Sequence, residues 1–469
     1  MPSVGAASTS VVERYRRAAR LAVAVLGFTG LARVSHAQSP DVAPKDTSTL
    51  ADVGAGSVAQ RLTAKFDPRF HYAAYVPPGY RQSAPAPLLI LMDARGRAMV
   101  PLTIVRGIAA RVGWIVLSSY ETASADSTAS NAAAVNAMLT DAQAMLNVDA
   151  RRIYFAGFSG LARSSWQFAE AMSGGVAGII VAGASGPPDI VRRLVRNAAP
   201  KYDVVLAAGD EDLNFDEVRF EYARLADLGA PVRFETFAGG HEWPTDSAMN
   251  NAIAWLEARS ALRPRVRRPL IDADSLYAAD TMRASRLESQ HRSGEAADAW
   301  TRNAVAWNGL HDISASLLIA GALAKEPAVV RWRAKRSGLD AVYGQWNDAM
   351  TATFGELKDA WRPDAKWLRR ELELDSLTRW AATPDDSVRA AWATRRINLI
   401  FAHLVKYQPD ILLAAKRPRG ALAALAVARQ LYPGATTMLC AREADAYDQL
   451  HDAAKASAAR ACAAGVPPP

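Results

Sequence analysis

The sequence has few histidines and cysteines, although it has many carboxylates. Its 469 residues include only two cysteines and seven histidines, and nowhere do histidines and cysteines gather at the spacing that metal ligands need. A glycine-rich phosphate-binding motif is also absent. We therefore predict a protein that works without a metal ion or another cofactor.

Apolar runs long enough to cross a bilayer are lacking as well. The run LAVAVLGFTGLA near the N-terminus is well short of the roughly 20 residues that a spanning helix needs. Arginines precede this run and the small residues SHA follow it, which is the layout of a secretory signal peptide. We predict that residues 1–37 are cleaved near Ala37 and that the protein is exported to the periplasm or secreted; an uncleaved anchor is the weaker alternative.

The excess of basic charge is modest outside that segment. Residues 1–37 hold five arginines and one glutamate, which account for +4 of the formal net charge of +8. The remaining charge gives no reason to expect a nucleic-acid partner. The basic stretch RPRVRRP, residues 263–269, is interrupted by proline, and we interpret residues 261–271 as a solvated linker.

Composition predicts an ordinary globular protein of two or three domains, since half of the residues are hydrophobic and 22% are charged.

After a predicted linker at 38–65, residues 66–260 alternate short apolar runs with helical stretches. Several runs are apolar throughout, which is typical of parallel strands covered on both faces. We predict a doubly wound, mostly parallel α/β sheet. Its strands are expected near 71–77, 87–93, 113–120, 152–158, 175–183, 202–209 and 232–239, and its helices at 99–110, 129–146, 160–172, 188–197, 214–228 and 246–259.

The pattern changes to a helical period after residue 271, and we predict an all-helical domain at 272–465. One stripe places Trp392, Ile400 and Leu404 on a single helix face. Residues 286–307 and 421–434 weakly resemble tetratricopeptide helices, and this resemblance implies a repeat-like domain that binds a protein partner. Cys440 and Cys462 could form a disulfide in an oxidising compartment, or remain two buried thiols.

A candidate nucleophile lies in the stretch RIYFAGFSGL, where a buried strand turns sharply into a helix at Ser159. Gly157 permits the tight turn, and the amide of Gly160 follows the serine at the start of the helix. A serine becomes a nucleophile only if a base removes its proton and donors stabilise the oxyanion.

The base and its orienting acid are expected at two later strand ends. His241 follows the last predicted strand of the sheet in the glycine-containing loop GGHEWP. Asp212, in the loop GDEDLN after the penultimate strand, is the preferred acid, and Asp210 is the alternative. Catalytic groups of α/β proteins gather at this edge of the sheet.

Residues 66–259 resemble the α/β-hydrolases of the dienelactone hydrolase and polyhydroxybutyrate-depolymerase-like esterase group. The stretches that carry the resemblance are YVPPGY, PLLILMDARG, RIYFAGFSG, GDEDLN and GGHEWP. The resemblance implies the α/β-hydrolase fold, a triad of Ser159, Asp212 and His241, and hydrolysis of a small or polymeric ester.

Two features depart from that group. The turn has Leu161 where the group has a glycine, and DARG replaces a His-Gly pair after the oxyanion strand. We assign the oxyanion amides to Gly160 and to Ala94 or Arg95, and we list Arg97 as a possible substrate contact. No long insertion interrupts the predicted strands, so no large lid is expected.

The prediction is thus an exported serine hydrolase that cleaves carboxylic esters. A peptidase or amidase would use the same three residues. The remaining alternative is a non-catalytic scaffold of the same fold, with the helical half as its binding module.

Overall fold

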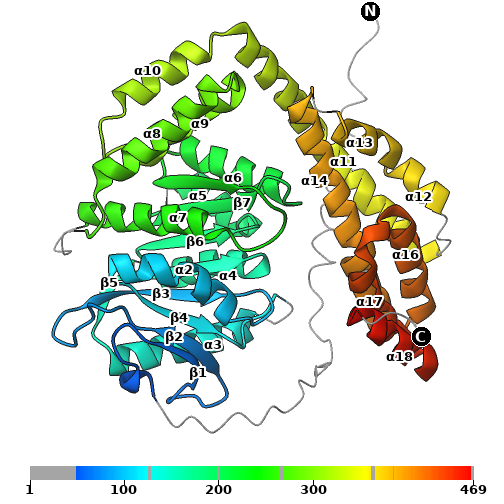
Figure 1. Cartoon of the computed structure of the whole chain (residues 1–469), viewed down its shortest axis with the longest axis horizontal. Helices are drawn as coiled ribbons and strands as arrows, with labels where there is room; N and C mark the ends of the chain where they lie inside the picture. The colour runs from blue at the N-terminus through cyan, green and yellow to red at the C-terminus, as the bar shows by residue number, and fades with distance from the viewer. Residues whose placement is uncertain are drawn as a thin grey trace, which may run out of the picture.

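A computed structural model describes residues 49–124, 128–172, 174–197, 200–263, 269–360, 365–383 and 385–465. The predicted signal peptide lies outside these residues. Figure 1 shows a sheet half with helices on both faces, followed by a group of helices that stands beside it.

One eight-stranded sheet organises the first half, with the strand order β1-β2-β4-β3-β5-β6-β7-β8. Pairing is antiparallel between β1 and β2 and between β2 and β4, and it is parallel in every other neighbouring pair. The strands are β1 (Val58–Thr63), β2 (His71–Tyr75), β3 (Ala86–Met92), β4 (Ile115–Ser119), β5 (Val148–Phe158), β6 (Gly178–Ala182), β7 (Asp203–Gly209) and β8 (Val232–Phe237). The predicted doubly wound, mostly parallel sheet is therefore confirmed.

Helices cover both faces of this sheet. Side chains of α2 and α7 pack into one core, and those of α3, α4, α5 and α6 pack into the core of the opposite face. The bounds are α2 (Met99–Val112), α3 (Thr128–Met145), α4 (Gly160–Ala171), α5 (Pro188–Asn197), α6 (Phe215–Asp227) and α7 (Asp246–Arg259). Each of the six predicted helices is present, with ends within two residues of the prediction.

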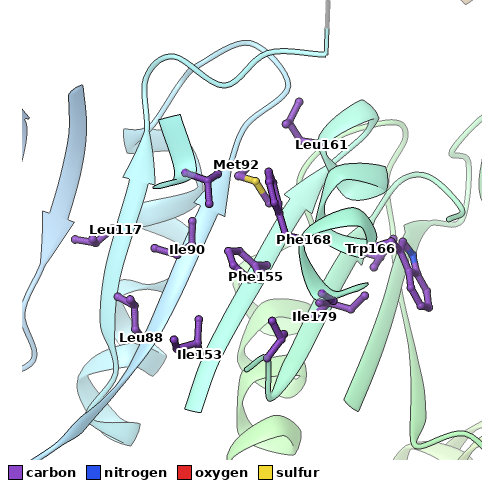
Figure 2. Packing of buried hydrophobic residues seen from close by; sticks show 14 of the residues in the cluster. Leu88, Ile90, Met92, Leu117, Ile153, Phe155, Leu161, Trp166, Phe168 and Ile179 are labelled. Carbon is purple, nitrogen blue, oxygen red and sulfur yellow. The ribbon is translucent and has the colours of Figure 1, made fainter. Parts of the chain in front are cut away.

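Strand β3 shows why the central strands read as continuous apolar runs. Every residue of β3 is buried. Successive side chains of a strand point to opposite faces, so Leu88 and Ile90 enter one core while Leu89 and Leu91 enter the other. Figure 2 shows Ile90 beside Phe155 of β5 and Leu88 beside Ile153 of the same strand.

Both predicted linkers contain residues that belong to the sheet half. Strand β1 lies within 38–65 and pairs with β2 at the edge of the sheet; its polar, partly exposed sequence VAQRLT hid it from a search for apolar runs. Arg263, which we predicted to be solvated, donates to Asp203 Oδ2 at 2.8 Å. The basic stretch is thus tethered to β7 at its first residue.

The second half is helical throughout its described residues, as predicted, but its first hairpin belongs to the packing of the sheet half. Trp307 of α9 is fully buried in the same core as Trp255 of α7, and α9 lies against β8. The helices are α8 (Ala273–Ser289), α9 (Ser293–Trp307), α10 (Ser314–Leu323), α11 (Pro327–Ala360), α12 (Ala365–Glu371), α13 (Leu374–Ala381), α14 (Ser387–Ala402), α15 (Gln408–Ala414), α16 (Pro418–Leu431), α17 (Thr436–Gln449) and α18 (Ala453–Ala463), with the π-helical turn η3 (His403–Tyr407) between α14 and α15.

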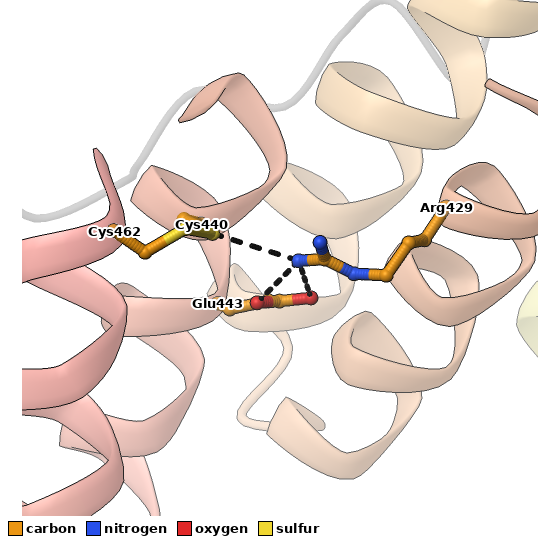
Figure 3. The surroundings of a disulfide bond; sticks show 4 residues. All are labelled: Arg429, Cys440, Glu443 and Cys462. Carbon is orange, nitrogen blue, oxygen red and sulfur yellow. Dashed lines mark hydrogen bonds and ion pairs between the residues drawn. A yellow bond between two sulfur atoms is a disulfide. The ribbon is translucent and has the colours of Figure 1, made fainter. Parts of the chain in front are cut away.

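A separate core holds the later helices together. Trp392, Ile400 and Leu404 are buried in it side by side, which confirms the predicted stripe. At its end, Cys440 of α17 and Cys462 of α18 form a disulfide. Figure 3 shows the Arg429 side chain bridging Glu443 and the Cys440 sulfur beside this disulfide. Within the part of the chain that the structure describes, no helix is both long and apolar enough to span a membrane.

Candidate active site

Ser159 and His241 line a cavity of about 310 Å³ beyond the carboxyl ends of the parallel strands. A second cavity of similar volume lies between β8 and the α8–α9 hairpin. Arginines dominate that second cavity, and its carboxylates Glu235 and Asp280 are paired with Arg233, so among the described residues it holds no nucleophile with a free base beside it. The cavity at Ser159 is therefore the candidate active site.

Ser159 occupies a strained turn between β5, which ends at Phe158, and α4, which begins at Gly160. Its φ of 57° is a conformation that L-residues other than glycine rarely adopt. The amide of Ser159 donates to Ala182 O at 2.8 Å, which ties the turn to the end of β6. This geometry is the sharp strand-to-helix turn that exposes a serine hydroxyl above a sheet.

Leu161 is compatible with this turn because the close approach occurs elsewhere. A Cβ on Gly157 would lie 2.0 Å from the carbonyl oxygen of Leu161, so only glycine fits at position 157. The Leu161 side chain is fully buried in the same core as Phe155 and Phe168 (Figure 2) and does not line the cavity of Ser159. The departure from the hydrolase pattern thus leaves the turn intact.

Ser159, His241 and Asp212 form a continuous chain of hydrogen bonds. Ser159 Oγ lies 3.0 Å from His241 Nε2, and His241 Nδ1 lies 3.0 Å from Asp212 Oδ1. Because a carboxylate only accepts, the proton sits on Nδ1, and Nε2 is free to accept the serine proton. The structure therefore brings together the three residues that the sequence placed at three separate strand ends.

The two acidic candidates have different surroundings. Asp212 is fully buried, and its Oδ1 also accepts from the amide of Asn214 at 2.8 Å. Asp210 instead accepts from the amide of Gly239 at 3.0 Å and has no contact with His241 among the described residues. Asp212 is thus the residue that orients the histidine, while Asp210 holds the loop that carries it.

Two backbone amides are available for an oxyanion. The amide of Gly160 is the first of α4 and has no intrahelical acceptor. The amide of Arg95 donates to Asp93 Oδ1 at 2.8 Å, so this amide is not free to bind an oxyanion. The amide of Ala94, the other predicted donor, has no acceptor among the described residues. Gly160 and Ala94 are the remaining donors.

Asp93 organises the oxyanion loop and was missed by the sequence analysis. It is fully buried, and it accepts from Arg97 Nη2 at 2.9 Å and from Trp243 Nε1 at 2.7 Å. Burial opposes its ionisation, but the hydrogen bonds from Arg97 and Trp243 outweigh burial and hold the pKa of Asp93 below its ordinary value. Asp93 thereby links the loop after β3 to the loop of His241. The sequence did contain a sign of this role, because Asp93 is a charged residue directly after the apolar strand β3.

The helical half also reaches this site, although no lid was expected. Arg395 of α14 donates to Asp216 at 3.1 Å and to the carbonyl oxygen of Asp210 at 3.3 Å, and Asn398 donates to the carbonyl oxygen of Glu211 at 2.8 Å. Lys406 of η3 lines the cavity of Ser159. Among the described residues no insertion of the sheet half forms a lid, and the second half of the chain reaches the site instead.

The sheet order and the strand–turn–helix at Ser159, followed by Asp212 and then His241, give this half the α/β-hydrolase fold. No protein-family model and no curated protein sequence matches the chain.

Among solved structures, the chain is similar to FphF, a fluorophosphonate-binding serine hydrolase of Staphylococcus aureus, with a TM-score of 0.37 and 14% identity over 43% of this chain and 99% of that one. It is similar to S-formylglutathione hydrolase FrmB of the same organism, with a TM-score of 0.37 and 13% identity over 43% of this chain and 98% of that one. It is also similar to the esterase Est2 of Thermogutta terrifontis, with a TM-score of 0.33 and 13% identity over 46% of this chain and 96% of that one.

Proposed function

We propose that this protein is a serine hydrolase that cleaves carboxylic esters. The observation that carries the proposal is the hydrogen-bond chain from Ser159 Oγ through His241 to the buried Asp212. The strained conformation of Ser159, with φ 57° and ψ −124°, adds support, because backbone strain of this kind clusters at active sites.

The proposed reaction proceeds in two halves. His241 Nε2 takes the Ser159 proton as the hydroxyl attacks the ester carbonyl, and the amides of Gly160 and Ala94 stabilise the resulting oxyanion. The protonated histidine then gives its proton to the departing alcohol, which leaves an acyl group on Ser159. Water, deprotonated by His241, releases the acid and restores the serine. Asp212 stabilises the imidazolium in both halves.

The side chains around the serine suit an ester that has a polar part. Arg97 lines the cavity, and we retain it as a proposed substrate contact beside its hydrogen bonds to Asp93. Phe158 and Trp243 form an aromatic wall, with Phe158 4.8 Å from the His241 ring between centroids. Such a mixture of apolar wall and placed polar groups is typical of small-molecule sites.

The test is covalent labelling by a fluorophosphonate together with a panel of p-nitrophenyl esters and the matching anilides. We expect the wild type to be labelled and to hydrolyse esters, and Ser159→Ala to lose both properties. Ser83→Ala is the control, because Ser83 is an exposed serine of the same half outside the cavity lining; its labelling should persist. A folded wild type that is not labelled would contradict the proposal, and hydrolysis of anilides alone would make the protein an amidase.

Export is a second part of the proposal and rests on the sequence of residues 1–37. The Cys440–Cys462 disulfide is compatible with an oxidising compartment. N-terminal sequencing of the protein from an expressing bacterium tests it: we expect a new N-terminus at Gln38, and an uncleaved chain in the cytoplasm would contradict it. Protein binding by the helical half remains a prediction.

A further inference from the structure

The cavity at Ser159 contains more positive than negative charge, and the two halves of the chain both contribute to it. Arg95 and Arg97 come from the loop after β3, and Lys406 comes from η3 of the helical half. Glu242 is the one carboxylate in the lining. The Glu242 carboxylate folds toward Gly239, where its Oε1 lies 2.5 Å from the position that a Gly239 Cβ would occupy.

These three cations differ in how they are neutralised. Arg97 is paired with the buried Asp93 at 2.9 Å. Neither the Arg95 guanidinium nor the Lys406 ammonium has an ion pair among the described residues, and Asp410, one helical turn beyond Lys406, is paired with Arg442 at 2.9 Å. Two cations thus face a substrate-sized space without an ion-pair partner among the described residues, although the Asp410 carboxylate attracts Lys406 from nearby.

Lys406 is held in place by an unusual segment of backbone. It lies on the π-helical turn η3, and such turns occur frequently at functional sites. The adjacent Leu404 and Val405 are buried in the core of the later helices, which fixes the direction in which Lys406 emerges. A lysine that served only solubility would need no such placement.

The neighbouring charges repel each other. Partial burial of Lys406 lowers its pKa, the Arg95 and Arg442 guanidinium groups lower it further, and Asp410 opposes them. An anion placed between the two side chains would remove this repulsion and would gain two charge-assisted hydrogen bonds.

We propose that Lys406 and Arg95 form an anion subsite, so that the ester substrate carries a carboxylate in addition to the ester bond. This inference rests on the proposed esterase function. It also gives the helical half a role: the half completes the active site and selects the substrate. In this view the sheet half supplies the reacting groups, while recognition of the carboxylate requires both halves.

The test compares two substrates that differ in one charge, p-nitrophenyl hemiglutarate and its methyl ester. We expect the full-length wild type to have the higher kcat/KM for the hemiglutarate. Lys406→Met and Arg95→Met should each lower the hemiglutarate-to-methyl-ester ratio of kcat/KM about tenfold, mainly through KM, since a hydrogen bond to a charged group is lost. Lys406→Arg, which keeps the charge, should retain most of the preference.

Lys325→Met is the matched control, because Lys325 is an exposed lysine of the helical half that lies outside the cavity and forms no ion pair within the described residues; its ratio should equal that of the wild type. A wild type that hydrolyses both esters without preferring the hemiglutarate would overturn the subsite and leave the esterase function standing. Equal losses on both substrates in Lys406→Met would also overturn it. A wild type that hydrolyses neither ester and resists fluorophosphonate labelling would refute the esterase function itself.

Discussion

The carboxylate of Asp216 on α6 is bound by the guanidinium of Arg395 on α14, with Nε and Oδ2 3.1 Å apart. Arg396 binds the same carboxylate at 2.8 Å. All three side chains are almost completely buried, and Asp216 is only four residues from the acid of the triad. Burial opposes the charge of Asp216, but the two arginines outweigh it and lower the pKa of Asp216. A single carboxylate thus joins the helical half to the acid loop.

Replacing Asp216 should therefore lower the stability of the folded protein. We expect Asp216→Asn to lower the free energy of unfolding by about 3–5 kcal/mol, because it leaves two buried guanidinium groups without their counter-charge. Urea unfolding measures this. Asp340→Asn, which breaks the more exposed pair with Arg219, should cost about 1 kcal/mol or less. Equal losses in the two variants would contradict the central role of Asp216.

The choice between the two acids gives a kinetic prediction. Asp212→Asn should lower kcat by about 10³- to 10⁴-fold, because an amide no longer fixes the His241 tautomer or stabilises the imidazolium. Asp210→Asn should lower kcat far less, since Asp210 contacts the Gly239 amide instead of the histidine. Steady-state kinetics with a p-nitrophenyl ester separates them, and the reverse order of losses would show that Asp210 is the acid.

The turn at Ser159 predicts an unusual sensitivity to one methyl group. Gly157→Ala would place its Cβ against the backbone oxygen of Leu161, which cannot move without shifting the start of α4. We expect a loss of at least about 2 kcal/mol in unfolding free energy and of most activity. Gly107→Ala on α2 is the control: a Cβ there meets nothing, and alanine should stabilise the helix by about 0.5–1 kcal/mol. Thermal melts compare the two variants. A Gly157→Ala variant as stable as the wild type would contradict the close approach of position 157 to the Leu161 carbonyl oxygen.

Glu221 predicts a pH-dependent term in stability. Burial raises the pKa of Glu221 to about 7, from an ordinary 4.5. The folded state then holds a proton that the unfolded state has released, so the stability contributed by Glu221 is complete below pH 4.5 and is lost as the pH rises through 7.

Glu221→Gln removes this term because glutamine does not titrate. We expect the unfolding free energy of the wild type minus that of Glu221→Gln to fall by on the order of 3 kcal/mol between pH 4 and pH 8. Denaturant titrations across this range measure the difference, with the exposed Glu326→Gln as the reference. A difference that does not change with pH would show that Glu221 titrates normally.

The sheet, its helices and the order of the triad were accessible from the sequence because each depends on local pattern. Central strands such as β3 are apolar on both faces. Ser159 follows β5 directly, and Asp212 and His241 lie three and four residues beyond the ends of β7 and β8. Strand β1 was missed for the same reason, since an edge strand with polar residues lacks the pattern. Asp93 was noted as a departure from a known motif, but its role depends on Trp243, 150 residues away.

What the sequence determined by itself was the set of elements and which residues lie at the strand ends, because side-chain period and turn residues act over a few positions. Only the tertiary structure decided which charged side chains line the cavity and which residues of the second half reach the site. Lys406 reaches the cavity of Ser159, and Arg395 reaches Asp216, from helices about 180 to 250 residues further along the chain. Such contacts arise from how the two halves pack, and buried ion pairs between distant helices leave no local period in the sequence.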